Sequence, residues 1–310
     1  MAAVSKRGRA RREVFVRPGG GRAPSRWFFN PRGRAGKTKR AKWGIMDGAM
    51  SFVRSFFLAL STFSRIPAPR VAWSGRNMRY LLCFFPFVGV FVGALLLVVC
   101  ALERRFFPRG PFLFPLALTL APLFVTGGIH MDGFMDTCDA LASRGRAEER
   151  VSVMHDPHVG AFAVMGAASY LLARFALCAE LLSRFGGAAS ARSFSALVAF
   201  ALSPAVSRLL SALSVCAFPK ADGSSLLRAF SDAAARRFTL VWCAFFLALA
   251  FVLLAAACGR PGLAVIVSSL AAFAWYFSLA RRRFGGTTGD LAGWFVQVCE
   301  LLCLLGVCVA

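Results

Sequence analysis

Seven apolar runs of about 20 residues determine what this chain can fold into. They lie near residues 80–102, 110–129, 160–182, 191–216, 238–258, 261–280 and 290–309. A helix of this length crosses the hydrocarbon core of a bilayer, and only 16% of the chain is charged, against about 25% in an average soluble domain. The sequence therefore predicts an all-α polytopic membrane protein. We expect a bundle of about six or seven transmembrane helices with a polar site at one membrane face.

The first 45 residues form a separate, strongly basic segment. They hold fourteen Lys or Arg residues against one acid, Glu13, and so supply much of the net charge of +23. Their Gly, Pro and Arg content without helical periodicity is typical of a disordered extension. Such a tail could bind nucleic acid or anionic lipid. We favour a dispensable tail or a start codon placed too far upstream, with no nucleic-acid partner.

The predicted membrane-embedded domain covers residues 46–310. Its first apolar segment, "MSFVRSFFLALSTFSRIPAP", is interrupted by Arg54 and Arg65 and ends in a Pro-Ala-Pro turn that stops a helix. We expect this segment to lie on the membrane surface and not to cross it.

The segment "GGIHMDGFMDTCDA", residues 127–140, concentrates carboxylates in a chain that has few of them. At 100° per residue, Asp132, Asp136 and Asp139 lie at 0°, about 40° and about 340° on a helix, so they share one face. Like charges at this spacing repel one another, and a divalent cation would remove the repulsion. Oxygen ligands without thiolates favour Mg²⁺, so these three residues are the predicted metal ligands. The alternative is a solvated acidic connection between spans.

A second polar turn, "MHDPHVGAF", follows at residues 154–162. We expect Pro157 to lie in the first turn of the next span and Asp156 to cap that helix. The helix N-terminus near Gly160 would then face the carboxylates, where its free amides could bind a phosphate. In the first segment, Gly127 and Gly128 either end the preceding helix or let a ligand approach the backbone closely.

A third polar segment, "RRRFGGTTGDLAGWFVQVCE", lies at residues 281–300. A Gly-rich turn with Thr288, Gly289 and Asp290 before a helix is compatible with phosphate or metal binding. Glu300 stands within an apolar run, where an ionisable side chain is a candidate functional residue.

These three segments, with "FSRIPAP" and "FFPFVGVFVG" before them, resemble the cobalamin synthase family, the adenosylcobinamide-GDP ribazoletransferases, over about residues 50–310. The resemblance implies a Mg²⁺-dependent enzyme of the bacterial inner membrane that acts in the last steps of cobalamin biosynthesis. It would join adenosylcobinamide-GDP to α-ribazole, or to α-ribazole 5′-phosphate, and release GMP. Besides the lipid bilayer, other enzymes of cobalamin assembly are candidate partners.

The resemblance also implies roles for the polar residues. The catalytic candidates are His130, Asp132, Asp136, Asp139, His155 and Asp156. The candidates for substrate binding are Arg65, Gly127, Gly128, His158, Gly160, Thr288, Gly289, Asp290 and Glu300. His130 or His155 would accept the proton of the attacking hydroxyl group.

The chain departs from the family pattern at several positions. Pro157 and His158 replace the Ser and Arg of the family's second motif, and Lys220 stands where a later turn has Arg. The last motif has Trp294 where a small residue is usual and Gln297 where an acid often stands. Because Pro157 and His158 replace the Ser and Arg, it is not evident which residue of this chain would make the family's cationic contact to phosphate.

Two other classes of protein fit part of the pattern. A CDP-alcohol phosphotransferase or a membrane prenyltransferase would also use carboxylates, but their characteristic aspartate motifs are absent. A divalent-cation transporter would place acids and histidines within a bundle, but at mid-depth on several spans. Here six of the fourteen acids fall within twenty-five residues at one connection.

Overall fold

The computed structural model describes residues 44–106, 112–186, 190–221 and 225–310, and the basic segment 1–43 lies outside them. The described residues are almost entirely helical, and the one β-contact among them is an isolated bridge between Lys220 and Thr287. The helices are α1 (Gly44–Phe63), α2 (Gly75–Met78), α3 (Leu81–Phe106), α4 (Leu113–Thr126), α5 (Ile129–Ala142), α6 (Ala147–Met154), α7 (Ala161–Phe185), α8 (Ala191–Ala217), α9 (Ser225–Ala233), α10 (Arg236–Arg283) and α11 (Gly289–Val309).

Five of these helices, α3, α7, α8, α10 and α11, are long and apolar enough to cross a membrane. Their outward surfaces suit a lipid environment, since large apolar side chains such as Leu172, Val241 and Val252 are exposed. Helix α1 contributes only a shorter apolar stretch, Met50–Phe63. The predicted all-α membrane bundle is confirmed.

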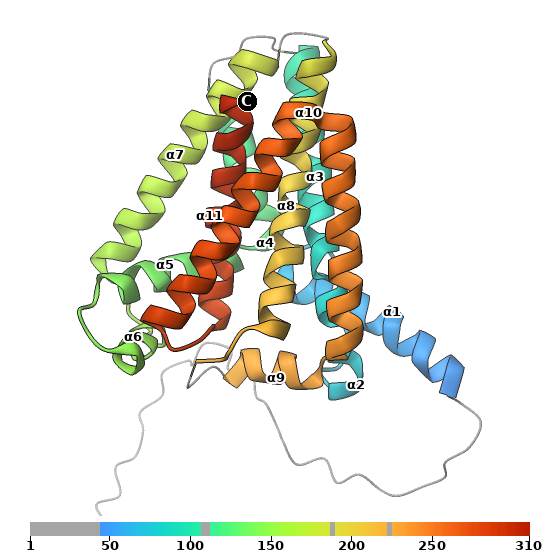
Figure 1. Ribbon diagram of the computed structural model, residues 1–310, viewed down its shortest axis with the longest axis vertical. Coiled ribbons are helices and arrows are strands. Elements are labelled where there is room, and N and C mark those ends of the chain that lie inside the picture. The colour runs from blue at the N-terminus through green and yellow to red at the C-terminus, as the bar shows by residue number, and fades with distance from the viewer. Residues whose placement is uncertain (1–43, 107–111, 187–189, 222–224) are drawn as a thin grey trace, which may run out of the picture. The chain divides into compact units, whose positions relative to one another are not determined.

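Helix α10 consists of two helices joined by a sharp reversal at Gly259, whose backbone angles (φ 54°, ψ −130°) are not helical. Arg236, at the start of α10, donates a hydrogen bond to the carbonyl of Cys216. Tyr276, near the end of α10, packs against Phe218, which lies two residues after Cys216 in the sequence. The two halves therefore run side by side in opposite directions (Figure 1). They correspond to the predicted spans 238–258 and 261–280.

The centre of the bundle is the crossing of α3 and α8. A Cβ atom on Gly89 would lie 2.3 Å from the carbonyl oxygen of Pro204, and one on Gly93 would lie 2.0 Å from that of Ala201. Only glycine permits so close an approach of the two backbones. Small residues at helix contacts are characteristic of membrane bundles, where dispersion forces hold the helices together.

The predicted span at residues 110–129 differs from expectation. The chain forms the 14-residue helix α4 and then turns by 97° into α5. The turn uses positive φ angles at Gly127 (65°) and Gly128 (81°), a conformation that favours glycine. Of the two interpretations of this glycine pair, the structure therefore supports the helix end.

The polar elements gather at one end of the bundle. Figure 1 shows α5, α6, α9 and the beginning of α11 at the lower end, whereas the C-terminus lies at the opposite end. Helix α5 packs mainly against α11 and α7. The segment rich in aspartate is thus a helix held within the bundle, and the alternative of a solvated connection does not describe it.

Candidate active site

The carboxylates of α5 face the first turn of α11. A Cβ atom on Gly133 would lie 2.7 Å from the Cα of Asp290, so the absence of a side chain there lets the two helices touch. Asp290 thereby joins Asp132 and Asp136 in one group. The carboxylate face predicted for α5 and the turn before α11, predicted to bind phosphate or metal, therefore lie at the same place. They are about 150 residues apart in the sequence.

The electrostatics of Asp136 show how crowded this group is. Burial, followed by the negative charges of Asp132, Asp290 and Asp139, raises the pKa of Asp136 to about 7. Helix α5 is not one of the helices long enough to cross the membrane. A carboxylate that resists ionisation for this reason would be stabilised in its charged form by a cation.

Asp139 makes contacts that were not expected from the sequence. Its two carboxylate oxygens accept hydrogen bonds from the backbone amides of Gly160 (2.7 Å) and Ala163 (2.8 Å). These amides begin α7, so the side chain of Asp139 caps that helix from another segment. The amide of Gly160, expected to bind a phosphate, is engaged by Asp139.

Two expectations about the start of α7 are wrong. The helix begins at Ala161 with Gly160 as its N-cap residue, so Pro157 is not in its first turn. Asp156 does not cap it, because the Oδ1 atom of Asp156 accepts hydrogen bonds from the backbone amide and the Nδ1 atom of His158. These hydrogen bonds lower the pKa of the exposed Asp156.

The histidines near the carboxylates, His130 and His155, differ in their exposure. His155 is exposed and close enough to Asp290 for their charges to interact. His130 is only 5% exposed, and its Nε2 atom is buried without a hydrogen-bond partner. Burial and the positive charge of Arg208 hold the pKa of His130 well below its usual value, which disfavours the protonated imidazole.

The Gly-rich turn before α11 is fixed by its backbone contacts. A Cβ atom on Gly286 would lie 2.4 Å from the amide nitrogen of Ala221, so the turn and the Lys220 segment touch closely. Thr288 caps α11 by accepting a hydrogen bond from the amide of Leu291 (3.0 Å). Thr288 is therefore a structural cap, whereas Gly289 and Asp290 line a cavity beside α5.

Arg65 lies at the bend between α4 and α5. Its backbone amide donates to the carbonyl of Val125 (2.7 Å), and a Cβ atom on Gly127 would lie 2.8 Å from its Nε atom. The exposed Arg65 side chain thus crosses the Gly127 turn. The absence of a side chain at Gly127 leaves room for the side chain of Arg65. A Cβ atom on Gly128 would have no other atom within 4 Å.

Glu300 does not reach this site. It is 2% exposed and accepts hydrogen bonds from Arg208 (2.7 Å) and Arg174 (3.4 Å), which are themselves 1% exposed. The three side chains link α11, α8 and α7 inside the bundle. Sequence reasoning missed both arginines, although each is an ionisable residue within an apolar run, the same signal that singled out Glu300.

The oxygen-rich group on α5 and α11 suits Mg²⁺ by its chemistry. Mg²⁺ is usually held by one or two carboxylates together with substrate phosphates. Among the described residues, no three Asp, Glu, His or Cys side chains already converge as a closed metal site. The side chains of Asp132, Asp136 and Asp290 lie close enough for their charges to interact and could hold such a cation, whereas the carboxylate of Asp139 also accepts two hydrogen bonds from the start of α7.

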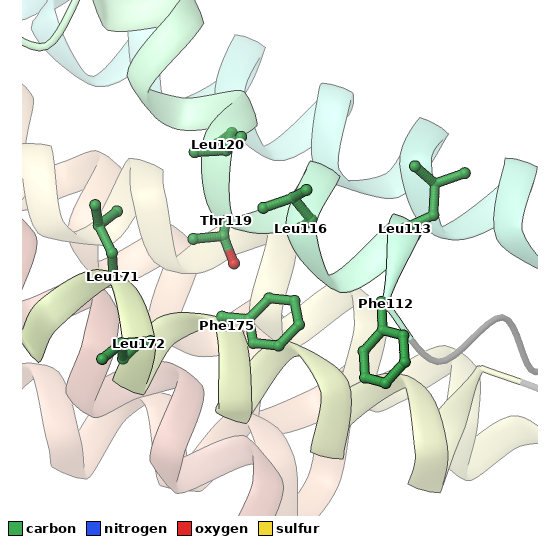
Figure 2. Close-up of a pocket in the computed structure, with 8 residues that line it drawn as sticks. All are labelled: Phe112, Leu113, Leu116, Thr119, Leu120, Leu171, Leu172 and Phe175. Atoms are coloured by element: carbon green, nitrogen blue, oxygen red, sulfur yellow. The ribbon is translucent and has the colours of Figure 1, made fainter. Parts of the chain in front are cut away.

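Two cavities differ sharply in character. The first, about 680 Å³, lies between α4 and α7 and is lined by apolar side chains with only Thr119 polar, as Figure 2 shows. None of the predicted site residues lines it. The second, about 270 Å³, is bordered by His130, Asp132 and Asp290. The second cavity is therefore the one that belongs to the site.

A multi-span helical bundle with carboxylates, a buried histidine and a cavity gathered at one end defines a membrane-embedded enzyme. A family model described as cobalamin-5-phosphate synthase matches residues 55–308. The chain belongs to that family. The match does not favour the other transferases or the cation transporter considered from the sequence.

Three relatives carry the same printed name, adenosylcobinamide-GDP ribazoletransferase. The protein from Lachnoclostridium phytofermentans is 34% identical over 84% of this chain and 95% of its own length. That from Polaromonas sp. is 34% identical over 86% of this chain and all of its own. That from Geobacillus kaustophilus is 34% identical over 78% of this chain and 90% of its own length. No solved structure matches this chain.

Proposed function

We propose that this protein joins adenosylcobinamide-GDP to α-ribazole, or to its 5′-phosphate, and releases GMP. Membership of the family supports this reaction, as do the names of the relatives. One observation assigns the reaction to particular residues. Asp132, Asp136 and Asp290 lie together beside a cavity that His130 borders. A transfer between two substrates needs such a place, where phosphate charge and an attacking hydroxyl group are held together.

Asp132, Asp136 and Asp290 are the residues proposed to hold Mg²⁺ against the pyrophosphate. When bound, the cation would neutralise charge on the phosphate oxygens. The exposed Arg65 side chain, over the Gly127 turn that precedes α5, would add a cationic contact. Asp139 supports the group indirectly by tying the end of α5 to the start of α7.

His130 is proposed to accept the proton of the attacking ribose hydroxyl group. The hydroxyl oxygen forms a bond to the phosphorus on the cobinamide side of the pyrophosphate, and the bond from that phosphorus to the oxygen of GMP breaks. This role is supported by the place of His130 at the border of the cavity and by its Nε2 atom, which makes no hydrogen bond within the described residues. His155, which is exposed beside Asp290, is the alternative acceptor.

The reaction can be tested on the purified chain in detergent or liposomes. Adenosylcobinamide-GDP and α-ribazole, supplied with Mg²⁺, should give equal amounts of the cobalamin product and GMP, measured by mass spectrometry. Omitting α-ribazole should abolish the cobalamin, and chelating Mg²⁺ should abolish both products. A folded preparation that makes neither product in the complete mixture would contradict the proposal.

We also propose that the site faces the cytoplasm of a bacterial cell. Basic residues accumulate on the cytoplasmic side of membrane proteins. The connections at the site end carry Arg65, Arg70, Arg76, Arg79, Arg144, Arg146, Arg236, Arg237, Arg281, Arg282 and Arg283. The described residues of the opposite end carry fewer, namely Arg104, Arg105, Arg184, Arg192 and Arg260.

Cysteine labelling in intact cells tests this orientation. We expect Arg260→Cys, at the reversal within α10, to react with a membrane-impermeant maleimide added outside. Arg146→Cys, exposed beside α6, should react only after the cells are opened. The unmodified chain is the control for its ten native cysteines. The reverse pattern would place the site on the outer face.

A further inference from the structure

The cavity of about 270 Å³ beside the carboxylates has two unlike walls. Helices α5 and α11 supply His130, Asp132 and Asp290. The remaining wall, from α1, α3, α8 and α9, is mainly apolar and includes Phe63, Phe85, Val215, Leu227 and Phe230, with Thr62 and Ser211 its polar members. Segments far apart in the sequence are thus brought together around one small space.

Aromatic rings surround His130 within this cavity. The Phe63 ring stacks on the imidazole at 6.4 Å between centroids, and the Phe85 ring meets it edge-on at 5.5 Å. Phe63 also packs against Phe85 (4.4 Å) and Phe230 (6.2 Å). Flat rings in contact with one another favour a flat apolar ligand among them. Such a ligand would lie beside the His130 side chain, which borders the cavity.

We propose that this cavity, lined by Phe63, Phe85, Val215, Leu227 and Phe230, binds the benzimidazole base of the ribazole acceptor and points its ribose at His130. This inference rests on the proposed function and adds which part of which substrate the cavity holds. It makes these apolar residues determinants of acceptor specificity, while His130, Asp132 and Asp290 act on the ribose and the phosphates.

Size and polarity exclude the other large groups of the reaction. The cavity volume of about 270 Å³ lies just below the range of about 300–1,000 Å³ typical of small-molecule pockets, which favours a small base over a corrin macrocycle. Guanine and adenine carry several hydrogen-bonding groups, and burying these against Phe, Leu and Val would leave them unpaired, which is unfavourable. Dimethylbenzimidazole presents one ring nitrogen and otherwise apolar edges, which suits this wall.

Filling the cavity tests the inference. Val215→Phe places a larger side chain in it from α8, and Val198→Phe makes the same change on the same helix away from the cavity. Isothermal titration calorimetry in detergent should show at least a tenfold weaker Kd for α-ribazole in Val215→Phe. The Kd for adenosylcobinamide-GDP should stay within twofold, and Val198→Phe should leave both constants unchanged.

A smaller acceptor provides the complementary measurement. The riboside of benzimidazole without its two methyl groups should lose less affinity than α-ribazole in Val215→Phe, because it needs less space. Ser211→Leu, a second filling variant, should repeat the pattern if Val215→Phe does not fold.

Binding is measured without turnover, so the two proposals fail in different ways. Weaker binding of adenosylcobinamide-GDP with unchanged α-ribazole binding would overturn the assignment of the cavity. Unchanged binding of both substrates in the folded filling variants would overturn it as well, even if the wild-type chain makes cobalamin. Tight α-ribazole binding that is lost in Val215→Phe would uphold the cavity even if no transfer were observed.

Discussion

Asp136→Asn is expected to lower the turnover of the proposed transfer by about 100- to 1,000-fold, the usual effect of removing one group that stabilises charge in a transition state. Burial disfavours the ionised form of Asp136, and so do the charges of its neighbours Asp132, Asp290 and Asp139. The amide keeps the shape of the side chain, so the loss reports the charge. Initial rates of GMP release at saturating substrates measure the effect.

The control for this variant is Glu148→Gln, which makes the same chemical change at an exposed position of α6. Its turnover should match that of the wild-type chain. If Mg²⁺ is held by these carboxylates, Asp136→Asn should also need a higher Mg²⁺ concentration for half-maximal rate. Wild-type turnover in a folded Asp136→Asn preparation would show that the site lies elsewhere.

Glu300→Gln is expected to destabilise the bundle by about 3–5 kcal/mol, the usual cost of breaking a buried ion pair by removing one partner. The variant would leave Arg174 and Arg208, each 1% exposed, without the carboxylate that contacts both. Unfolding by SDS titration, followed by circular dichroism, measures the change. The reason is electrostatic, since the two side chains have nearly the same volume.

Glu180→Gln provides the matched control. Glu180 pairs with Arg184 within α7, but both side chains are about half exposed. Loss of an exposed pair costs about 0–1 kcal/mol. Adding Arg174→Met to Glu300→Gln should recover part of the lost stability, because it removes one of the two unpaired charges. Equal stability of the Glu300 and Glu180 variants would contradict the explanation.

Local patterns were enough to predict the carboxylate face of α5 and the apolar helices, except for the predicted span at residues 110–129. Apolar length and the 100° helical repeat depend only on neighbouring residues. The reversal at Gly259 was also anticipated by the boundary between two apolar runs. The Gly127–Gly128 turn was ambiguous, because a glycine pair serves equally to end a helix and to admit a ligand.

Contacts between distant segments could not be predicted in this way. Asp156, the nearest acid to α7, was the natural cap from sequence, but Asp139 takes that place from 21 residues earlier. Glu300 was recognised as unusual, yet its partners are on two other helices. The apolar wall of the cavity combines four helices whose phenylalanines are indistinguishable from core residues until the fold is known.

The shortness of α4 has a consequence for the surrounding bilayer. A helix of 14 residues is about 21 Å long, whereas the hydrocarbon core is about 30 Å thick. The chain then turns by 97° into α5. In Figure 1, α5 lies above the level of α6 and α9. We therefore expect the lipid beside α4 to be thinner than elsewhere around the bundle. Turnover in liposomes should accordingly depend on acyl-chain length, so that membrane thickness becomes a determinant of the chemistry.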